Sequence, residues 1–493
     1  MNLGAYLRAR GRRGLGVAAL GPNEARVLFD FALAASAWIA ALAFLKQFAP
    51  GVDAPLLRTS MLPVVCLAAM AGFGIYTRLR LASPSRKALA LAISVGTTTV
   101  VGWMAGVAPA VLVLWALLTL PTAVVARLLL GLPYSRRASL TALAVTRHGP
   151  VLVIGGAGYI GSLTVERLLE QGHRVRVLDR LMYGSEPLRA FLGSPNFDLI
   201  EGDVTDVSKL TAAMRHASAV IHLAGLVGDP ACAVDGDFTR HANIVATRMA
   251  REVAQSLGVH RFIFASSCSV YGASDREMRE GDELNPVSLY AETKIDSERE
   301  LLFSVRDDFF VTILRFATVF GHSRRPRFDL VANLFAAQAV ANGAITVIGP
   351  DQWRPFIHVR DLARAIVMVL EARPETVQSQ IYNVGDDRLN MTIGEIGQLV
   401  RRTVGAHRDV TVNVQEGDQD RRNYRVSFEK VRSALGFNAE TTLEQGVAEM
   451  VERLRAGEYG DYRDPIYSNV ATTRAALQDF YESSELYAPR RAS

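Results

Sequence analysis

Cysteine is scarce in this sequence. The 493 residues include three, Cys66, Cys232 and Cys268, too few and too widely spaced for a disulfide framework or a zinc site. We therefore expect no metal, and a reducing compartment for the bulk of the chain. Charged residues are also few, at 21% against 49% hydrophobic residues, which excludes a disordered chain. A chain of this length needs more than one core, so two or more domains are expected.

Acidic residues are almost absent from the first 149 residues. This part holds three acids against 15 Lys and Arg, a net charge of +12. The rest of the chain carries 46 acids against 39 Lys and Arg, a net charge of −7, so the overall charge of +5 conceals two opposite parts. The basic excess lies beside apolar segments and the larger part is acidic. We therefore expect no nucleic-acid partner.

Long apolar stretches occur only in the basic part. Four of them are found, at residues 27–45, 60–76, 88–105 and 109–126. Each is close to the ~20 residues that a helix needs to cross a bilayer. None shows the polar stripe of a helix in a soluble bundle, which is the alternative reading. The sequence therefore predicts a four-helix transmembrane anchor at residues 27–130, after a cytoplasmic tail at residues 1–26.

The basic residues beside these stretches predict their orientation. Thirteen lie on the tail, between the second and third stretches, or after the fourth, whereas only Lys46 and Arg58 flank the first external loop. Both termini are thus expected in the cytoplasm. A cleaved signal peptide is the rejected alternative, because its Ala-Ser-Ala match at residues 35–37 lies inside an apolar run. We predict a multi-pass protein of the inner (plasma) membrane, with the bilayer as a partner and a cytoplasmic catalytic part after a linker at residues 131–149.

A glycine-rich turn follows the linker. Residues 151–154 form a short β-branched run, typical of a strand buried in a parallel sheet, and a helical pattern follows the turn. Glycines at these positions permit a tight turn, the approach of backbone N–H groups to a pyrophosphate, and close helix–strand packing. We expect a dinucleotide to bind there. The residues expected to hold it are Gly155, Gly158, Tyr159, Ile160 and Gly161.

The next predicted strand, residues 174–178, ends in Asp179, about 20 residues after the last glycine. A carboxylate there can hydrogen-bond the adenine ribose and would repel a 2′-phosphate, so NAD is the expected cofactor. The adjacent Arg180 leaves NADP as the alternative. Further cofactor contacts are expected where later strands end, at Asp203, Val204, Leu223 and Ala224.

Strand patterns continue to alternate with helical patterns. Apolar runs at residues 220–225 and 261–265 are separated by stretches of helical periodicity, which indicates an α/β, Rossmann-type doubly wound parallel sheet. We predict an NAD-binding Rossmann domain at residues 150–320. Residues 321–493 are expected to form a smaller C-terminal α/β domain that mainly binds substrate and returns some segments to the sheet.

Tyr290 and Lys294 are spaced for catalysis. Residues four apart share one face of a helix. A phenol with its ordinary pKa of about 10 is a poor base at neutral pH, and a neighbouring ammonium lowers that pKa. Ser267, at the end of the preceding strand, can hydrogen-bond the same substrate hydroxyl. We therefore predict Ser267, Tyr290 and Lys294 as the catalytic set.

With these motifs, residues 150–450 resemble the extended short-chain dehydrogenase/reductase family of nucleotide-sugar enzymes, in particular the UDP-galactose 4-epimerase group. The resemblance implies that Tyr290 is the base, that Lys294 binds the nicotinamide ribose, and that Ser267 completes the site. It also favours a homodimer. The resemblance places the substrate at Ser267, Asn333, Arg354 and Arg422, where arginine suits a diphosphate. Three nearby cations are expected on a solvated face: Arg324, Arg325 and Arg327.

The residues after Ser267 separate the subclasses of this family. Sugar 4,6-dehydratases and the related decarboxylases carry a glutamate two positions later, whereas here Cys268 and Ser269 follow. Without that acid, elimination of water has no evident catalyst. We therefore expect an NAD-dependent sugar 4-epimerase that acts through a transient keto sugar. An NAD(P)H-dependent keto-sugar reductase, a sugar dehydratase on the same scaffold and a non-catalytic nucleotide-sugar-binding membrane scaffold remain as alternatives.

The expected anchor bears on the substrate. A free nucleotide sugar is soluble and needs no membrane enzyme, so an anchored enzyme suggests a polyprenyl-diphosphate-linked sugar. It equally suggests recruitment beside membrane glycosyltransferases that build surface polysaccharide. The sequence leaves both substrates, nucleotide-linked and lipid-linked, open.

Overall fold

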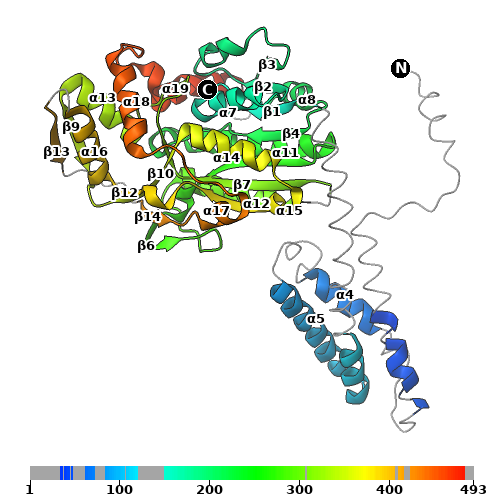
Figure 1. Ribbon diagram of the computed structural model, residues 1–493. Coiled ribbons are helices and arrows are strands. Elements are labelled where there is room, and N and C mark those ends of the chain that lie inside the picture. The colour runs from blue at the N-terminus through cyan, green and yellow to red at the C-terminus, as the bar shows by residue number, and fades with distance from the viewer. Residues whose placement is uncertain are drawn as a thin grey trace, which may run out of the picture. The chain divides into compact units, whose positions relative to one another are not determined.

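The computed structural model divides the chain into two units, Met1–Arg136 and Arg137–Ser493 (Figure 1). The structure describes residues 34–36, 38–44, 46–47, 61–72, 84–105, 107–119, 149–305, 308–405, 409–415 and 422–483. The predicted tail at residues 1–26 and nearly all of the predicted linker lie outside the described residues, as do parts of the first, second and fourth apolar stretches.

The described part of the first unit is helical. Its two complete helices are α4 (Met61–Gly72) and α5 (Pro84–Met104), and residues 109–119 are helical as well. A small apolar cluster buries Leu62 and Trp115, and the Trp115 indole donates a hydrogen bond of 3.3 Å to the Ala34 carbonyl. The apolar stretches therefore form helices that pack on one another.

Length and polarity set these helices apart from membrane spans. Helix α4 has 12 residues, well short of the ~20 that a bilayer requires. Helix α5 includes Arg86 and Lys87 in its first turn and a run of three threonines, Thr97 to Thr99, in its middle. Within the described ranges, no helix is long and apolar enough to cross a membrane. The predicted four-helix transmembrane anchor and inner-membrane location are wrong, and the lipid-linked substrate and the glycosyltransferase partners lose the observation that suggested them.

The second unit is built on a seven-stranded sheet in which every neighbouring pair is parallel (Figure 1). The strand order is β11-β7-β5-β4-β1-β2-β3. The strands are β1 (Val151–Ile154), β2 (Val175–Asp179), β3 (Phe197–Glu201), β4 (Ala219–His222), β5 (Arg261–Ser267), β7 (Phe310–Phe316) and β11 (Ile381–Val384). In this doubly wound order, β2 and β3 are added on one side of β1 and the strands from β4 onward on its other side. A dinucleotide binds at such a switch in strand order.

Helices cover both faces of this sheet, and the strand residues divide between them with a period of two. Val151 and Val153 of β1 join one buried cluster, whereas Leu152 and Ile154 join the other. The first face carries α7 (Tyr159–Glu170) and α14 (Val359–Glu371), and the second carries α8 (Val207–Met214), α11 (Ala246–Ser256) and α12 (Leu289–Phe303). Short elements between them are η1 (Glu186–Phe191), α9 (Asp229–Cys232), α10 (Gly236–Arg240), η2 (His241–Val245), η3 (Cys268–Tyr271) and α15 (Pro374–Val377).

A smaller α/β part of the second unit surrounds an apolar cluster of its own, separate from the two clusters on the faces of the main sheet. Its helices are α13 (Val331–Asn342), α16 (Ile393–Gly405) and α18 (Leu443–Arg455), and its two-stranded parallel sheet pairs β9 (Ala344–Ile348) with β13 (Thr411–Gln415). A three-stranded sheet joins β8 (Thr318–Phe320), β10 (Trp353–His358) and β12 (Asn390–Thr392), and β6 (Ala273–Met278) pairs with β14 (Asn423–Val426). The remaining elements are η4 (Asp387–Leu389), α17 (Glu429–Leu435), η5 (Pro465–Tyr467) and α19 (Asn469–Ser483).

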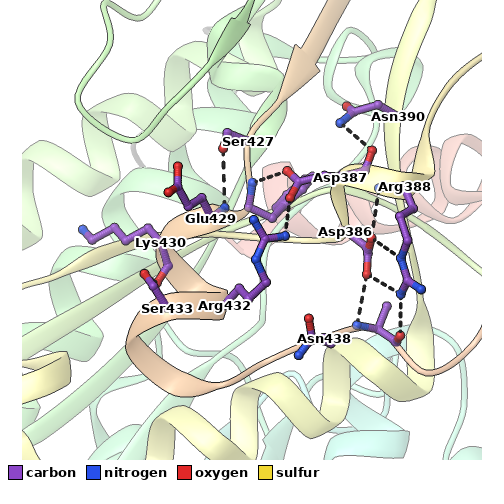
Figure 2. A network of polar contacts seen from close by, with 12 residues as sticks. Asp386, Asp387, Arg388, Asn390, Ser427, Glu429, Lys430, Arg432, Ser433 and Asn438 are labelled. Atoms are coloured by element: carbon purple, nitrogen blue, oxygen red, sulfur yellow. Dashed lines mark hydrogen bonds and ion pairs between the residues drawn. The ribbon is translucent and has the colours of Figure 1, made fainter.

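The chain does not divide cleanly at residue 320. Strand β11 lies in the main sheet, so residues well beyond the predicted Rossmann domain complete it. Figure 2 shows the polar contacts that hold the segments after β11 and after β14 together. Both oxygens of Asp386 accept hydrogen bonds from Arg388, and one also accepts from the backbone N–H of Ala439. Arg432 donates to Asp387 at 2.5 Å. The later segment is thereby fixed against the end of the sheet.

We expect Asp386→Ala to lower the free energy of unfolding by about 1–2 kcal/mol at neutral pH, because the buried N–H of Ala439 loses its acceptor. Hydrogen bonds from Arg388 lower the pKa of Asp386 despite its burial. The stabilisation is therefore present above the ordinary Asp pKa of about 3.9 and lost as the pH falls through the lower, folded-state value. Urea unfolding across this range tests it, with the exposed Glu186→Ala as control.

Candidate functional site

The glycine turn lies at the carboxyl end of β1 and has no room for a side chain at Gly155 or Gly161. Gly155 has φ +85°, and a Cβ placed there would lie 2.7 Å from the Ala224 nitrogen. A Cβ at Gly161 would lie 2.1 Å from the Gly155 oxygen. Gly158 is the N-cap of α7 and offers no side-chain acceptor, so the N–H groups of the first helical turn remain for a ligand. This turn fits the pyrophosphate of a dinucleotide.

Asp179 lies next to the turn, at the end of β2. Its carboxylate accepts hydrogen bonds of 2.9 Å from the backbone N–H groups of Ala157 and Leu181. Burial raises the pKa of Asp179, and these two hydrogen bonds oppose that rise. The adjacent Arg180 forms an ion pair with Asp203, with 3.2 Å between Nη1 and Oδ2. Because a carboxylate already neutralises Arg180, the site favours NAD over NADP.

The other expected cofactor residues divide into two groups. Leu223 and Ala224 both donate backbone hydrogen bonds to the Ile154 carbonyl, which places them beside the glycine turn. Tyr159 instead donates its hydroxyl to the Gly321 carbonyl at 2.7 Å. Val204 is buried in the apolar cluster under the sheet. Ile160 also packs, partly buried, against the core.

Ser267, Tyr290 and Lys294 come together where β5 ends and α12 begins. Ser288 is the N-cap of α12 and accepts a hydrogen bond from the backbone N–H of Ala291, which places Tyr290 in the first turn. The Ser267 hydroxyl lies close enough to the Tyr290 phenol to lower the pKa of that phenol. Lys294 Nζ lies 5.8 Å from the centroid of the Tyr290 ring. The three predicted side chains thus share one site.

Burial, rather than the Lys294 ammonium, has the largest effect on the pKa of Tyr290. Burial raises its pKa, with a further rise from the neighbouring Cys232 and a reduction from the Ser267 hydroxyl. Lys294 donates a hydrogen bond of 2.9 Å to the Ala265 carbonyl, and burial lowers its own pKa to about 8. Burial therefore outweighs any lowering of the Tyr290 pKa by the Lys294 ammonium, contrary to the expectation drawn from the four-residue spacing.

Two further groups lie near Tyr290: Asn243, which the family resemblance implies as the helix residue that steadies the active-site backbone, and Asp229, which was not predicted. Asn243 lies on the π-helical segment η2, a geometry frequent at functional sites. Its amide accepts from the Leu226 N–H and donates to the Leu226 carbonyl and the Thr293 hydroxyl, so it joins the loop after β4 to α12. Asp229 accepts a hydrogen bond of 2.8 Å from Ser288. Only the three-dimensional structure places Asp229 near this site, because the residues around it in the sequence are typical of an ordinary turn.

The residues expected to hold the substrate make contacts within the chain. Asn333 is 1% exposed, accepts a hydrogen bond from the Gly321 N–H and donates to the Arg327 carbonyl. Arg354 is buried and donates to the Trp353 and Arg422 carbonyls. Arg422 forms an ion pair of 3.2 Å with Asp229. Arg422 is thus the nearest of the three to Tyr290's helix, and the substrate role of all three stays a prediction.

Two of the three cations expected on a solvated face are buried instead. Arg325 is 5% exposed and donates to Asn469 at 2.8 Å. The Arg327 side chain is mostly buried and pairs with both oxygens of Asp329. Its positive charge lies close enough to Tyr290 to lower the phenol's pKa. Only Arg324, which pairs with Glu166, is substantially exposed.

The chain is similar in sequence and in fold to known proteins. Residues 151–385 match the NAD dependent epimerase/dehydratase family. A solved structure, MoeE5 in complex with UDP-glucuronic acid and NAD, is 31% identical, with a TM-score of 0.55, over 62% of this chain and 99% of that one. The chain belongs to the NAD dependent epimerase/dehydratase family. The enzyme class and the NAD cofactor predicted from the sequence are confirmed.

Two of the similar proteins are UDP-glucose 4-epimerases. The UDP-glucose 4-epimerase of Mycolicibacterium smegmatis is 29% identical over 312 residues, which cover 62% of this chain and 98% of that protein. The UDP-glucose 4-epimerase of Lactobacillus helveticus is 27% identical over 312 residues, 58% of this chain and 91% of that protein. The similarity therefore spans nearly the whole of these epimerases, and in this chain it includes both the NAD-binding sheet and the smaller α/β part.

We expect the activity of the wild-type enzyme to fall as the pH rises through about 8, where Lys294 loses its proton. The ammonium is the form that attracts a phenolate and hydrogen-bonds a ribose, and burial has depressed its pKa. Lys294→Arg keeps the charge at all accessible pH values, since a guanidinium does not deprotonate there. The fall above pH 8 should therefore disappear from the pH profile of this variant. An unchanged profile would assign the alkaline limb to another group.

Proposed function

We propose that this protein is a UDP-sugar 4-epimerase. It inverts carbon 4 of a UDP-linked hexose or hexuronic acid by transient oxidation to the 4-keto sugar. The observation that carries the proposal is the convergence of Ser267, Tyr290 and Lys294 beside a glycine turn that admits a dinucleotide. Relatives named UDP-glucose 4-epimerase, matched over nearly their full lengths, support it.

The chain's own residues have separate tasks in this reaction. Tyr290 exchanges a proton with the sugar hydroxyl at carbon 4, and the neighbouring Ser267 hydrogen-bonds that same hydroxyl. Lys294 stabilises the phenolate and is fixed by the Ala265 carbonyl. NAD supplies the hydride acceptor and donor. Because the hydride is returned, the reaction requires no net reductant.

The segment after Ser267 favours an epimerase over a dehydratase. The Cys268 thiol is 0% exposed and donates to the Arg315 carbonyl, which turns it away from the site, and burial raises its pKa well above the ordinary range. Ser269 donates its hydroxyl to Ser267 at 2.8 Å. Neither residue can protonate a leaving hydroxyl as a carboxylic acid would. Cys268 is therefore a packed thiol and takes no part in the proposed reaction.

A substrate panel tests the proposal. The purified chain is incubated with UDP-glucose, UDP-galactose, UDP-glucuronic acid and UDP-N-acetylglucosamine, without added cofactor, and the products are identified by NMR. The panel includes the uronic acid because MoeE5 has been solved with both UDP-glucuronic acid and UDP-glucose. We expect one pair of 4-epimers to interconvert. Stoichiometric consumption of added NADH would indicate the keto-sugar reductase instead, and binding without turnover would indicate a scaffold.

A further inference from the structure

Helix α19 forms one wall of the site around Tyr290. Its Phe480 ring lies 5.0 Å, between centroids, from the rings of both Phe238 and His241. Phe480 belongs to a buried apolar cluster against which Tyr290 packs. Tyr481 donates its hydroxyl to Asp235 at 2.8 Å. The last helix of the described chain is thus fixed to the segments that follow β4 and precede the catalytic helix.

The first residue of this helix makes three side-chain hydrogen bonds to three different loops. Asn469 is 4% exposed. Its Oδ1 accepts from the Tyr183 hydroxyl at 3.2 Å and from Arg325 Nη2 at 2.8 Å. Its Nδ2 donates to the Val227 carbonyl at 3.1 Å. An asparagine is required here, because one side chain must both accept and donate.

The positions of these partners show which loops of the fold Asn469 joins. Tyr183 lies in the loop after β2, four residues past Asp179, and Val227 lies in the loop after β4. The strand order β4-β1-β2 places β1 between them. The glycine turn at the end of β1, residues 155–161, therefore lies between the two loops that Asn469 joins. These loops form the two sides of the groove in which a dinucleotide binds in this fold.

The third partner is a buried cation. The Arg325 guanidinium stacks on the Tyr183 ring, with 3.7 Å from Cζ to the centroid. Burial lowers the pKa of Arg325 to about 10. Because Asn469 is neutral, it positions this guanidinium without neutralising it. Asn469 thus fixes the Tyr183 side of the groove twice, directly and through Arg325.

We propose that Asn469 is a positioning residue that latches the loops after β2 and β4 together across the glycine turn, and so slows the release of the bound dinucleotide. The inference rests on the proposed function, because an epimerase ends each turnover with its cofactor unchanged and gains from retaining it. The latch acts on retention and not on proton or hydride transfer, so kcat at saturating NAD is preserved.

The experiment measures cofactor release directly. Full-length wild type, Asn469→Ala and the control Arg474→Ala, at an exposed position of the same helix, are loaded with NADH and chased with excess NAD while NADH fluorescence is followed. We expect Asn469→Ala to release NADH about tenfold faster, since its partners lose their hydrogen bonds, and the control to match wild type. Epimerase activity of Asn469→Ala should come to depend on added NAD, with kcat within about twofold of wild type when NAD is saturating.

Equal release rates in wild type and Asn469→Ala would overturn the proposal. A melting curve shows whether each variant is folded. If Asn469→Ala does not fold, Tyr183→Phe removes one hydrogen bond and keeps the ring under Arg325, and it should release NADH about threefold faster. Release that depends on Asn469 in a protein without epimerase activity would sustain the latch and refute the proposed function. Slow release in every variant, with epimerase activity present, would refute the latch alone.

Discussion

Replacing Tyr290 by phenylalanine should reduce kcat for 4-epimerisation by about 10²–10⁴-fold, the usual contribution of a general acid–base group. The phenol lies beside the Ser267 hydroxyl, and removing it leaves the sugar alcohol without a proton acceptor. The ring remains packed against the apolar cluster that includes Phe480, so folding and NAD binding should be nearly unchanged. Initial rates with the active UDP-sugar, together with bound NAD content, measure both effects.

Tyr382→Phe is the matched control for this loss. The Tyr382 hydroxyl is also hydrogen-bonded, to the Thr376 carbonyl at 2.6 Å, and the residue is buried, but it lies on β11 at the edge of the sheet. It should retain a kcat within about twofold of wild type, because its hydroxyl contributes only an ordinary hydrogen bond to stability. Near-normal turnover in Tyr290→Phe would remove the phenol from the mechanism and leave Ser267 or Lys294 to transfer the proton.

The parts of the site that depend on residues close together in the sequence could be predicted. The turn at residues 155–161 needs glycines for steric reasons that act within seven residues, and the clashes of a Cβ at Gly155 and Gly161 bear this out. Asp179 and Lys294 likewise follow from a strand end and a helical spacing. The alternation of strand and helix patterns predicted the parallel sheet, and β1 is an apolar run buried on both faces.

The rest depends on contacts between distant segments. Arg325 and Arg327 lie in a short arginine-rich segment that reads as solvated, yet Asn469, 144 residues away, accepts a hydrogen bond from Arg325. The contacts of the Asn333 amide with backbone groups of the loop before α13 were likewise not evident from the sequence, and its substrate role stays a prediction. The pKa of Tyr290 was misjudged for the same reason. Spacing reveals the nearby ammonium but not the burial that outweighs it.

The membrane prediction failed for a different reason. Mean hydropathy over a stretch does not fix where a helix begins and ends. Helix α4, in the second apolar stretch, covers Met61–Gly72. Helix α5 starts earlier than the apolar stretch that it contains and so includes Arg86 and Lys87. The helices of the described residues therefore lack the uniform apolar length on which the prediction depended.

A buried ion pair beneath the catalytic serine should carry the largest stability effect in the second unit. Glu298 and Arg315 are joined by two hydrogen bonds, of 2.9 Å from Nε and 2.7 Å from Nη2, with both side chains 3% exposed. Glu298 also accepts from Ser266 at 2.5 Å, next to Ser267. Glu298→Leu leaves the guanidinium without a counter-charge, and we expect it to lower the free energy of unfolding by about 3–5 kcal/mol.

The double variant Glu298→Leu/Arg315→Met separates loss of charge balance from loss of shape. Removing both ions removes the uncompensated charge, so it should recover most of the stability lost in Glu298→Leu, as measured by urea unfolding. Its kcat should nevertheless stay below that of wild type, because the Ser266 hydroxyl has lost its acceptor and the backbone that carries Ser267 is less firmly held. If the double variant were as unstable as Glu298→Leu, the pair would be holding β7 to α12 by packing, and charge balance would contribute little to its stability.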